Sequence, residues 1–164
     1  MGTDKALIEI DGIPIAERVA LVLESAGCDP VVFVGGDPAL AELGRQHVPD
    51  LYPAEGPVGG VVTALSTLRD ADAVVVAACD LPDVDVAAVR AVMGTAEDRA
   101  EIRVADSGRV EPALACWPTL RRSQIENQFR GGQRALHRVI EAWEGVHVPV
   151  DPAAMRNVNR PDDL

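Results

Sequence analysis

Asp80 is the residue whose type and position best suit metal or nucleotide chemistry. It lies in Cys79-Asp80-Leu81-Pro82, directly after the continuous apolar stretch 73–78. Such a stretch is typical of a parallel β-strand covered on both faces. In a doubly wound α/β sheet, ligands bind beyond the carboxyl ends of the strands, where a carboxylate can reach them. The residues alone fit a turn or helix-capping role equally well.

A second candidate is the glycine-rich segment Gly56-Pro57-Val58-Gly59-Gly60, which precedes a helical pattern. Glycines let the backbone approach a ligand closely, and the N-terminus of a helix favours anions. No Gly-Lys-Ser/Thr follows, and the dinucleotide-binding glycine fingerprint is absent, so neither standard phosphate loop is present. A plain turn into a helix therefore remains open.

Other polar residues are ambiguous singly. Lys5, in Gly2-Thr3-Asp4-Lys5, could hold phosphates as a compact positive charge, although most terminal lysines are simply solvated. Asp50 and the segment Asn157-Val158-Asn159 have residue types that suit turns as well as ligands. The three histidines share no metal-ligand spacing.

The elements that would position these residues alternate between short apolar runs and helical patterns. This order predicts a single α/β domain, a doubly wound and mostly parallel sheet with helices on both faces. The expected helices cover 14–26, 61–68, 84–93, 120–128 and 133–143, and Asp37 is expected to cap a further helix through Leu43. The expected strands cover 6–10, 30–34, 73–78, 102–105, 111–117 and 146–150, with a brief one in 47–52.

Composition excludes several classes of protein. The chain has 164 residues, 48% of them hydrophobic, which argues against disorder. Its apolar runs are too short to cross a bilayer, so no membrane partner is expected. With 15 basic and 26 acidic residues, the net charge is −11, which disfavours nucleic acid as a partner. The widely spaced Cys28, Cys79 and Cys116 are expected to be reduced thiols in a cytoplasmic protein.

The order of the motifs resembles the molybdenum cofactor guanylyltransferase family, which has the nucleotide-diphosphosugar transferase-like fold. The resemblance covers almost the whole chain. Its pieces are Met1-Gly2-Thr3-Asp4-Lys5, Gly12-x-Pro14, Asp50, Gly56-Pro57-Val58-Gly59-Gly60, Cys79-Asp80-Leu81-Pro82, Glu111-Pro112-Ala113-Leu114, Gly131-Gly132 and Asn157-Val158-Asn159-x-Pro161.

The resemblance implies a Mg²⁺-dependent nucleotidyltransferase that moves GMP from GTP to molybdopterin cofactor and releases pyrophosphate. It also implies molybdoenzyme maturation proteins as further partners. Lys5 and Asp80 would be the catalytic residues, and Gly2, Lys5, Asp50, Gly59 and Asp80 would bind the nucleotide. Asp80 and Asn159 would hold the metal, while Glu111, Asn157 and Asn159 would lie on the molybdopterin side.

Two alternatives remain open. A cytidylyltransferase for the same cofactor is disfavoured, because that branch resembles Gly-x-Ser-Ser-Ser where this chain has Gly56-Pro57-Val58-Gly59-Gly60. A non-catalytic nucleotide-binding domain is the second. It draws its support from one departure: the family has a strand and a glycine-rich loop directly before the Met-Gly-x-Asp-Lys motif.

This departure leads us to expect that residues 1–164 form a nucleotidyltransferase domain truncated at its N-terminus relative to the family. The sheet would then lack its first strand. The strands on either side of the gap would expose unpaired N–H and C=O groups.

Overall fold

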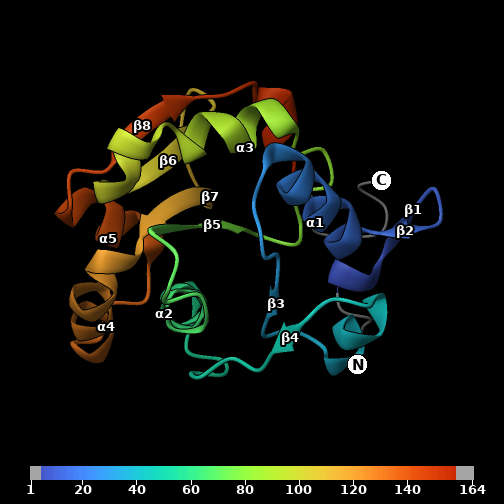
Figure 1. The fold of residues 1–164 in the computed structure, drawn as a ribbon, viewed down its shortest axis with the longest axis horizontal. Helices are drawn as coiled ribbons and strands as arrows, with labels where there is room; N and C mark the ends of the chain where they lie inside the picture. The colour runs from blue at the N-terminus through green and yellow to red at the C-terminus, as the bar shows by residue number, and fades with distance from the viewer. Residues whose placement is uncertain (1–4, 158–164) are drawn as a thin grey trace.

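A computed structural model describes residues 5–157 (Figure 1). The strands are β1 (Glu9–Ile10), β2 (Ile13–Pro14), β3 (Phe33–Val34), β4 (His47–Val48), β5 (Ala73–Ala77), β6 (Arg103–Asp106), β7 (Val110–Pro118) and β8 (Val146–Pro149). The α-helices are α1 (Ile15–Ala26), α2 (Pro57–Thr67), α3 (Val86–Met93), α4 (Arg122–Arg130) and α5 (Leu136–Ala142). Short 3₁₀ helices are η1 (Lys5–Leu7), η2 (Pro38–Leu43), η3 (Ala96–Ala100), η4 (Thr119–Arg121) and η5 (Pro152–Met155).

The main sheet has the strand order β5-β7-β6-β8. Strand β7 runs antiparallel to both β5 and β6, and β8 runs parallel to β6. The expected α/β architecture is confirmed, but the sheet is mixed where a mostly parallel one was expected. The reason is local: the turn at Ser107 and Gly108 reverses the chain, so β6 and β7 form a hairpin instead of a crossover pair.

Helices cover both faces of this sheet, and alternate residues of β7 supply the two cores. Leu114 packs in one cluster with α1 and α3. Its neighbours along the strand, Ala115 and Trp117, pack in another with α2, α4 and α5. In Figure 1, α3 lies above the sheet while α2 and α4 lie below it. The two-residue alternation of a strand explains how one strand serves both layers.

Helix α1 forms where its sequence pattern predicts. Its apolar positions repeat with a helical period, and Ile15, Ala16, Val19 and Ala20 are all buried. Gly27 ends the helix in a left-handed conformation with φ of 106°, which glycine adopts without a steric penalty. The buried stripe packs against α3, so α1 and α3 form one layer.

A smaller parallel pair, β3–β4, is separate from the main sheet. Within residues 5–157, no strand joins β3 to β5. The expected strand over 6–10 is only partly present, because Lys5–Leu7 forms η1 and the strand begins at Glu9. The burial of Ala6 in a small cluster with Ala16 and Phe33 favours that turn.

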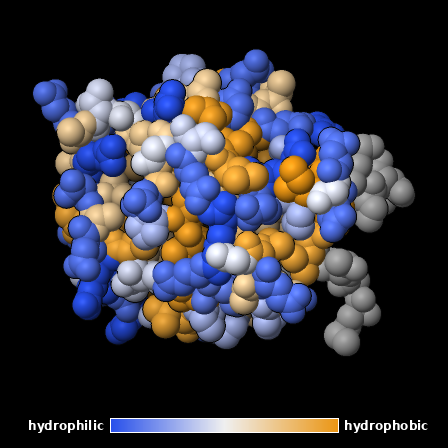
Figure 2. All heavy atoms as spheres, turned by 45° about the vertical axis from the view of Figure 1, so that its right-hand side comes forward, coloured by the Kyte–Doolittle hydropathy of each residue, from blue (hydrophilic) through white to orange (hydrophobic). Residues whose placement is uncertain are grey.

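The described surface is mostly polar, with apolar atoms gathered near the middle of the face in Figure 2. No helix within residues 5–157 is both long and apolar enough to span a bilayer. All three cysteines are free thiols, as expected. Burial raises the pKa of the Cys28 thiol, and it raises that of Cys116 to about 11.

Candidate nucleotide and metal site

Asp80 lies three residues beyond β5, at the carboxyl end of that strand. Its Oδ2 accepts a hydrogen bond of 3.0 Å from Asn157 Nδ2. Its Oδ1 is buried, and within the described residues no hydrogen-bond donor reaches it. A buried carboxylate oxygen without a donor is costly unless a cation or another donor satisfies it. Asp80 therefore presents a free oxygen that is suited to a cation.

Three neighbours fix the position of Asn157. Ala154 and Met155, at the end of η5, are buried in the core cluster that contains α1 and α3. Arg156 forms an ion pair with Asp83. These contacts hold the chain on both sides of the Asp80 turn, so two residues 77 positions apart in sequence meet at one point.

Asp50 follows β4, and its Oδ1 is already occupied. It accepts the Tyr52 N–H at 3.0 Å and the Thr63 hydroxyl at 2.7 Å. The Thr63 hydroxyl in turn accepts the Leu51 N–H at 3.1 Å. In this structure Asp50 therefore fastens the loop after β4 to helix α2.

Gly59 lies inside α2, which begins at Pro57 and not near residue 61 as the sequence suggested. A Cβ at Gly59 would lie 3.1 Å from Tyr52 Cβ and 3.4 Å from Phe129 Cε2. Such contacts are tighter than ordinary packing, so the glycine lets Tyr52 and Phe129 close over the helix. The structure thus gives Gly59 a packing role, while Gly56 caps the helix with φ of 91°.

Glu111 lies near the start of β7. Its Oε1 accepts hydrogen bonds from Ser107 Oγ at 2.7 Å and Arg109 Nε at 2.8 Å. Extending the β5–β7 register beyond Ala77 and Leu114 brings Glu111 level with Asp80. The two acidic residues therefore share one end of the sheet.

Lys5 is exposed and opens η1. The next residue, Ala6, belongs to the small hydrophobic cluster on which Cys79 also packs. Lys5 and Asp80 are thus each one residue away from a member of the same cluster. The remaining candidates, Gly2 and Asn159, lie outside the described residues.

The site offers few metal ligands. No three His, Cys, Asp or Glu side chains within residues 5–157 are grouped so that they could hold a metal ion. However, Mg²⁺ commonly binds through one or two carboxylates together with substrate phosphates and water. The free Oδ1 of Asp80 fits that mode of binding.

Two functional neighbours escaped the sequence reasoning. Thr63 is fully buried, and Asp83 anchors Arg156 beside the Asp80 turn. A hydroxyl within an otherwise apolar helix was a usable signal for Thr63, because a buried polar group needs a partner. Nothing local to Asp83 indicated its distant arginine.

Comparison with known proteins agrees with this arrangement. Residues 1–148 match the family described as MobA-like NTP transferase domain. A probable molybdenum cofactor guanylyltransferase from Opitutus terrae is 31% identical over 99% of this chain and 86% of its own length. Another from Pelotomaculum thermopropionicum is 34% identical over 100% of this chain and 83% of its own length.

A solved structure has the same fold. The crystal structure of molybdopterin-guanine dinucleotide biosynthesis protein A from Archaeoglobus fulgidus superposes with a TM-score of 0.72. It is 25% identical, and the alignment covers 99% of this chain and 87% of that one. With the site at the carboxyl end of β5, these matches show that the chain belongs to the MobA-like NTP transferase family of nucleotidyltransferases.

Proposed function

We propose that this protein transfers GMP from GTP to molybdopterin cofactor and releases pyrophosphate. The names of the relatives supply the substrates, and one observation carries the proposal to this chain. Asp80 combines a free buried oxygen with an anchored asparagine at the carboxyl end of β5. That is where ligands bind in α/β sheets.

The reaction needs no protein nucleophile. An oxygen of the terminal phosphate of molybdopterin forms a bond to the α-phosphorus of GTP. The bond between that phosphorus and the oxygen bridging to the β-phosphate breaks, and pyrophosphate leaves. Both reactants are anions, so the protein must align them and offset their repulsion.

The residues have separate tasks in this proposal. The Lys5 ammonium contacts the GTP phosphates, together with the backbone at Gly2. Asp50 orients the loop on the nucleotide side through Tyr52 and Thr63. Glu111, Asn157 and Asn159 lie toward molybdopterin.

Asp80 and Asn159 are the residues that would hold Mg²⁺. When bound, the ion supplies positive charge against the phosphates. Asn157 keeps Asp80 oriented by donating to its Oδ2, which leaves Oδ1 turned to the ligand. The cytoplasm as the location, maturation proteins as partners and an N-terminally truncated domain over 1–164 belong to the same proposal.

The test is a direct assay of the purified protein with Mg²⁺, molybdopterin and GTP labelled at its α-phosphate. We expect label in molybdopterin and one pyrophosphate for each label transferred. A parallel assay with CTP distinguishes the two nucleotides. Equal or faster transfer from CTP would identify a cytidylyltransferase.

Binding is measured beside turnover. Titration with Mg²⁺-GTP is expected to give saturable binding that Asp80→Asn weakens and that the exposed Asp70→Asn leaves unchanged. Binding without any transfer would leave a non-catalytic nucleotide-binding domain. Absence of both binding and transfer would overturn the proposal.

A further inference from the structure

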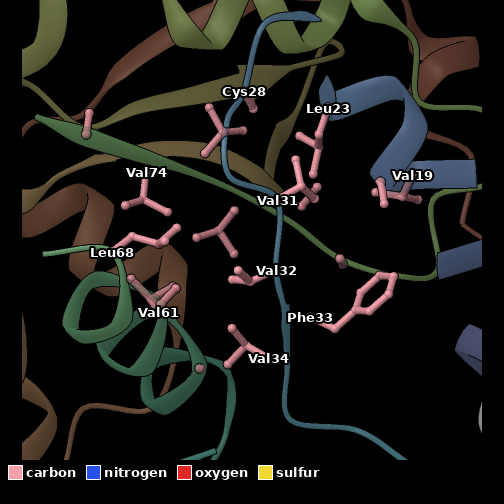
Figure 3. A pocket seen from close by; sticks show the side chains of 18 of the residues that line it. Val19, Leu23, Cys28, Val31, Val32, Phe33, Val34, Val61, Leu68 and Val74 are labelled. Carbon is pink, nitrogen blue, oxygen red and sulfur yellow. The ribbon is translucent and has the colours of Figure 1, made fainter. Parts of the chain in front are cut away.

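A cavity of about 530 Å³ separates β5 from the segment that leads into β3. Its walls come from α1, α2, β5 and residues 27–34, and they are largely apolar. Figure 3 shows Val32 and Val34 facing the same space as Val61 and Leu68 of α2 and Val74 of β5. For comparison, an engineered apolar cavity of about 150 Å³ holds a benzene molecule.

One wall of this cavity is an unpaired strand edge. Thr119 N donates to Asp72 O, and Ala78 N donates to Ala113 O. Hydrogen-bonded pairs alternate along an antiparallel ladder, so the even-numbered residues of β5 bond to β7. The N–H and C=O groups of Ala73, Val75 and Ala77 therefore point away from β7. All three residues line the cavity.

The opposite wall contains a second free edge. Phe33 N donates to Gln46 O, and Gly35 N donates to Val48 O. Because alternate residues of a strand bond to opposite sides, the backbone groups of Val34 point away from β4. Val34 also lines the cavity. No strand within residues 5–157 pairs with this side of β3 or of β5.

These features select the chemistry of an occupant. Backbone N–H and C=O groups beside an apolar space are costly unless they are paired. A lipid chain or a small apolar molecule would fill the space but would leave these groups unpaired. An extended peptide with apolar side chains satisfies both the walls and the edges, as in strand addition to a sheet.

We propose that the cavity is the seat of one further β-strand, formed by an apolar segment joined to this polypeptide ahead of Met1. It would pair with β5 and β3 and unite the two sheets. The lengths of the relatives agree with this: the Opitutus terrae protein matches 99% of this chain with 86% of its own length. The proposal concerns the fold and does not depend on the nucleotide that the protein uses.

The experiment compares the 164-residue chain with the same chain carrying an N-terminal extension. The extension has five valine and isoleucine residues and a flexible glycine-serine linker, which is varied from about 6 to 14 residues. Amide hydrogen exchange is followed residue by residue by NMR. With the best linker, the amides of Ala73, Val75 and Ala77 should slow at least about 100-fold. Those of Val74 and Val76, already bonded to β7, should change far less.

A matched control carries proline at the second and fourth positions of the added strand, which removes two donors and prevents regular pairing. It should give no selective protection. If the unextended chain precipitates, the soluble yield becomes the readout. The valine and isoleucine extension should then keep the chain in solution, and the proline version should not.

Three results would overturn the proposal. Exchange of Ala73, Val75 and Ala77 that is equal with and without every extension would show that no added strand pairs there. Protection that grows with protein concentration in the unextended chain, with a dimer in sedimentation, would identify a second copy as the occupant. Protection by the free five-residue peptide but by none of the extensions would show that the strand is not joined ahead of Met1.

Discussion

Asp80 and Asp50 have the same sequence signature and different structural situations. Each is an aspartate shortly after a strand, β5 for Asp80 and β4 for Asp50. The Oδ1 of Asp50 receives two donors from its own domain, whereas the Oδ1 of Asp80 is buried and receives none within the described residues. An aspartate after a strand is thus either an internal fastening or a ligand site, and the difference lies in which donors the fold supplies.

The largest expected effect comes from removing the charge of Asp80. Asp80→Asn keeps the shape, so we expect turnover to fall by at least about 100-fold, the scale of losing one main electrostatic stabiliser. The free energy of unfolding should change by less than about 0.5 kcal/mol. Steady-state kinetics and urea unfolding check the two parts. Full activity of this variant would remove Asp80 from the site, and Asp70→Asn serves as the exposed control.

Lys5 tests whether the Asp80 region extends to the first described residues. Lys5→Met should weaken GTP binding by about 1–3 kcal/mol, the scale of a hydrogen bond to a charged group. Lys5→Arg should restore most of the affinity because the charge remains. Calorimetric titration measures both. Unchanged affinity together with lower stability would make Lys5 a structural residue.

Asp50 should behave in the opposite way to Asp80. Asp50→Ala leaves the Tyr52 N–H and the Thr63 hydroxyl without their acceptor. We expect the free energy of unfolding to fall by about 1–3 kcal/mol, measured by urea denaturation. Asp50→Asn retains an acceptor oxygen and should lose less. Equal losses for Asp50→Ala and Asp80→Ala would erase the distinction between the two aspartates.

The smallest effect is expected from Asn157. Asn157→Ala removes the donor to Asp80 Oδ2, and the asparagine is exposed. We expect Mn²⁺, used as a spectroscopic substitute for Mg²⁺, to bind about three- to tenfold more weakly, in line with about 0.5–1.5 kcal/mol for one hydrogen bond. Asn127→Ala, an exposed asparagine on α4, is the matched control. A loss as large as that of Asp80→Asn would give Asn157 a direct role at the ion.

Local patterns carried most of the elements. The apolar period of residues 14–26 and the continuous run 73–78 correspond to α1 and β5. The expected cap at Asp37 is present: its Oδ1 accepts the Ala39 N–H, although the helix it begins is a short 3₁₀ helix. These features depend on neighbouring residues, so the sequence contains their physical cause.

Distant pairing could not be predicted in the same way. The antiparallel partnership of β5 with β7 and the parallel one of β6 with β8 join segments far apart in the chain. The start of α2 was misplaced because Gly59 suggested a turn, whereas its missing side chain makes room for Tyr52 and Phe129. Likewise, Asp50 and Asp80 differ through Thr63 and Asn157, which lie 13 and 77 residues away.

The separation of Asp80 from Asn157 also sets the order of events during synthesis. Ribosomes add about 5–20 residues per second, so the 77 residues between the two require roughly 4–15 s. Helices α1 and α2 and strand β5 have emerged well before then, but the anchored turn of η5 that carries Asn157 has not. A nascent chain therefore holds Asp80 without its asparagine until translation is almost complete.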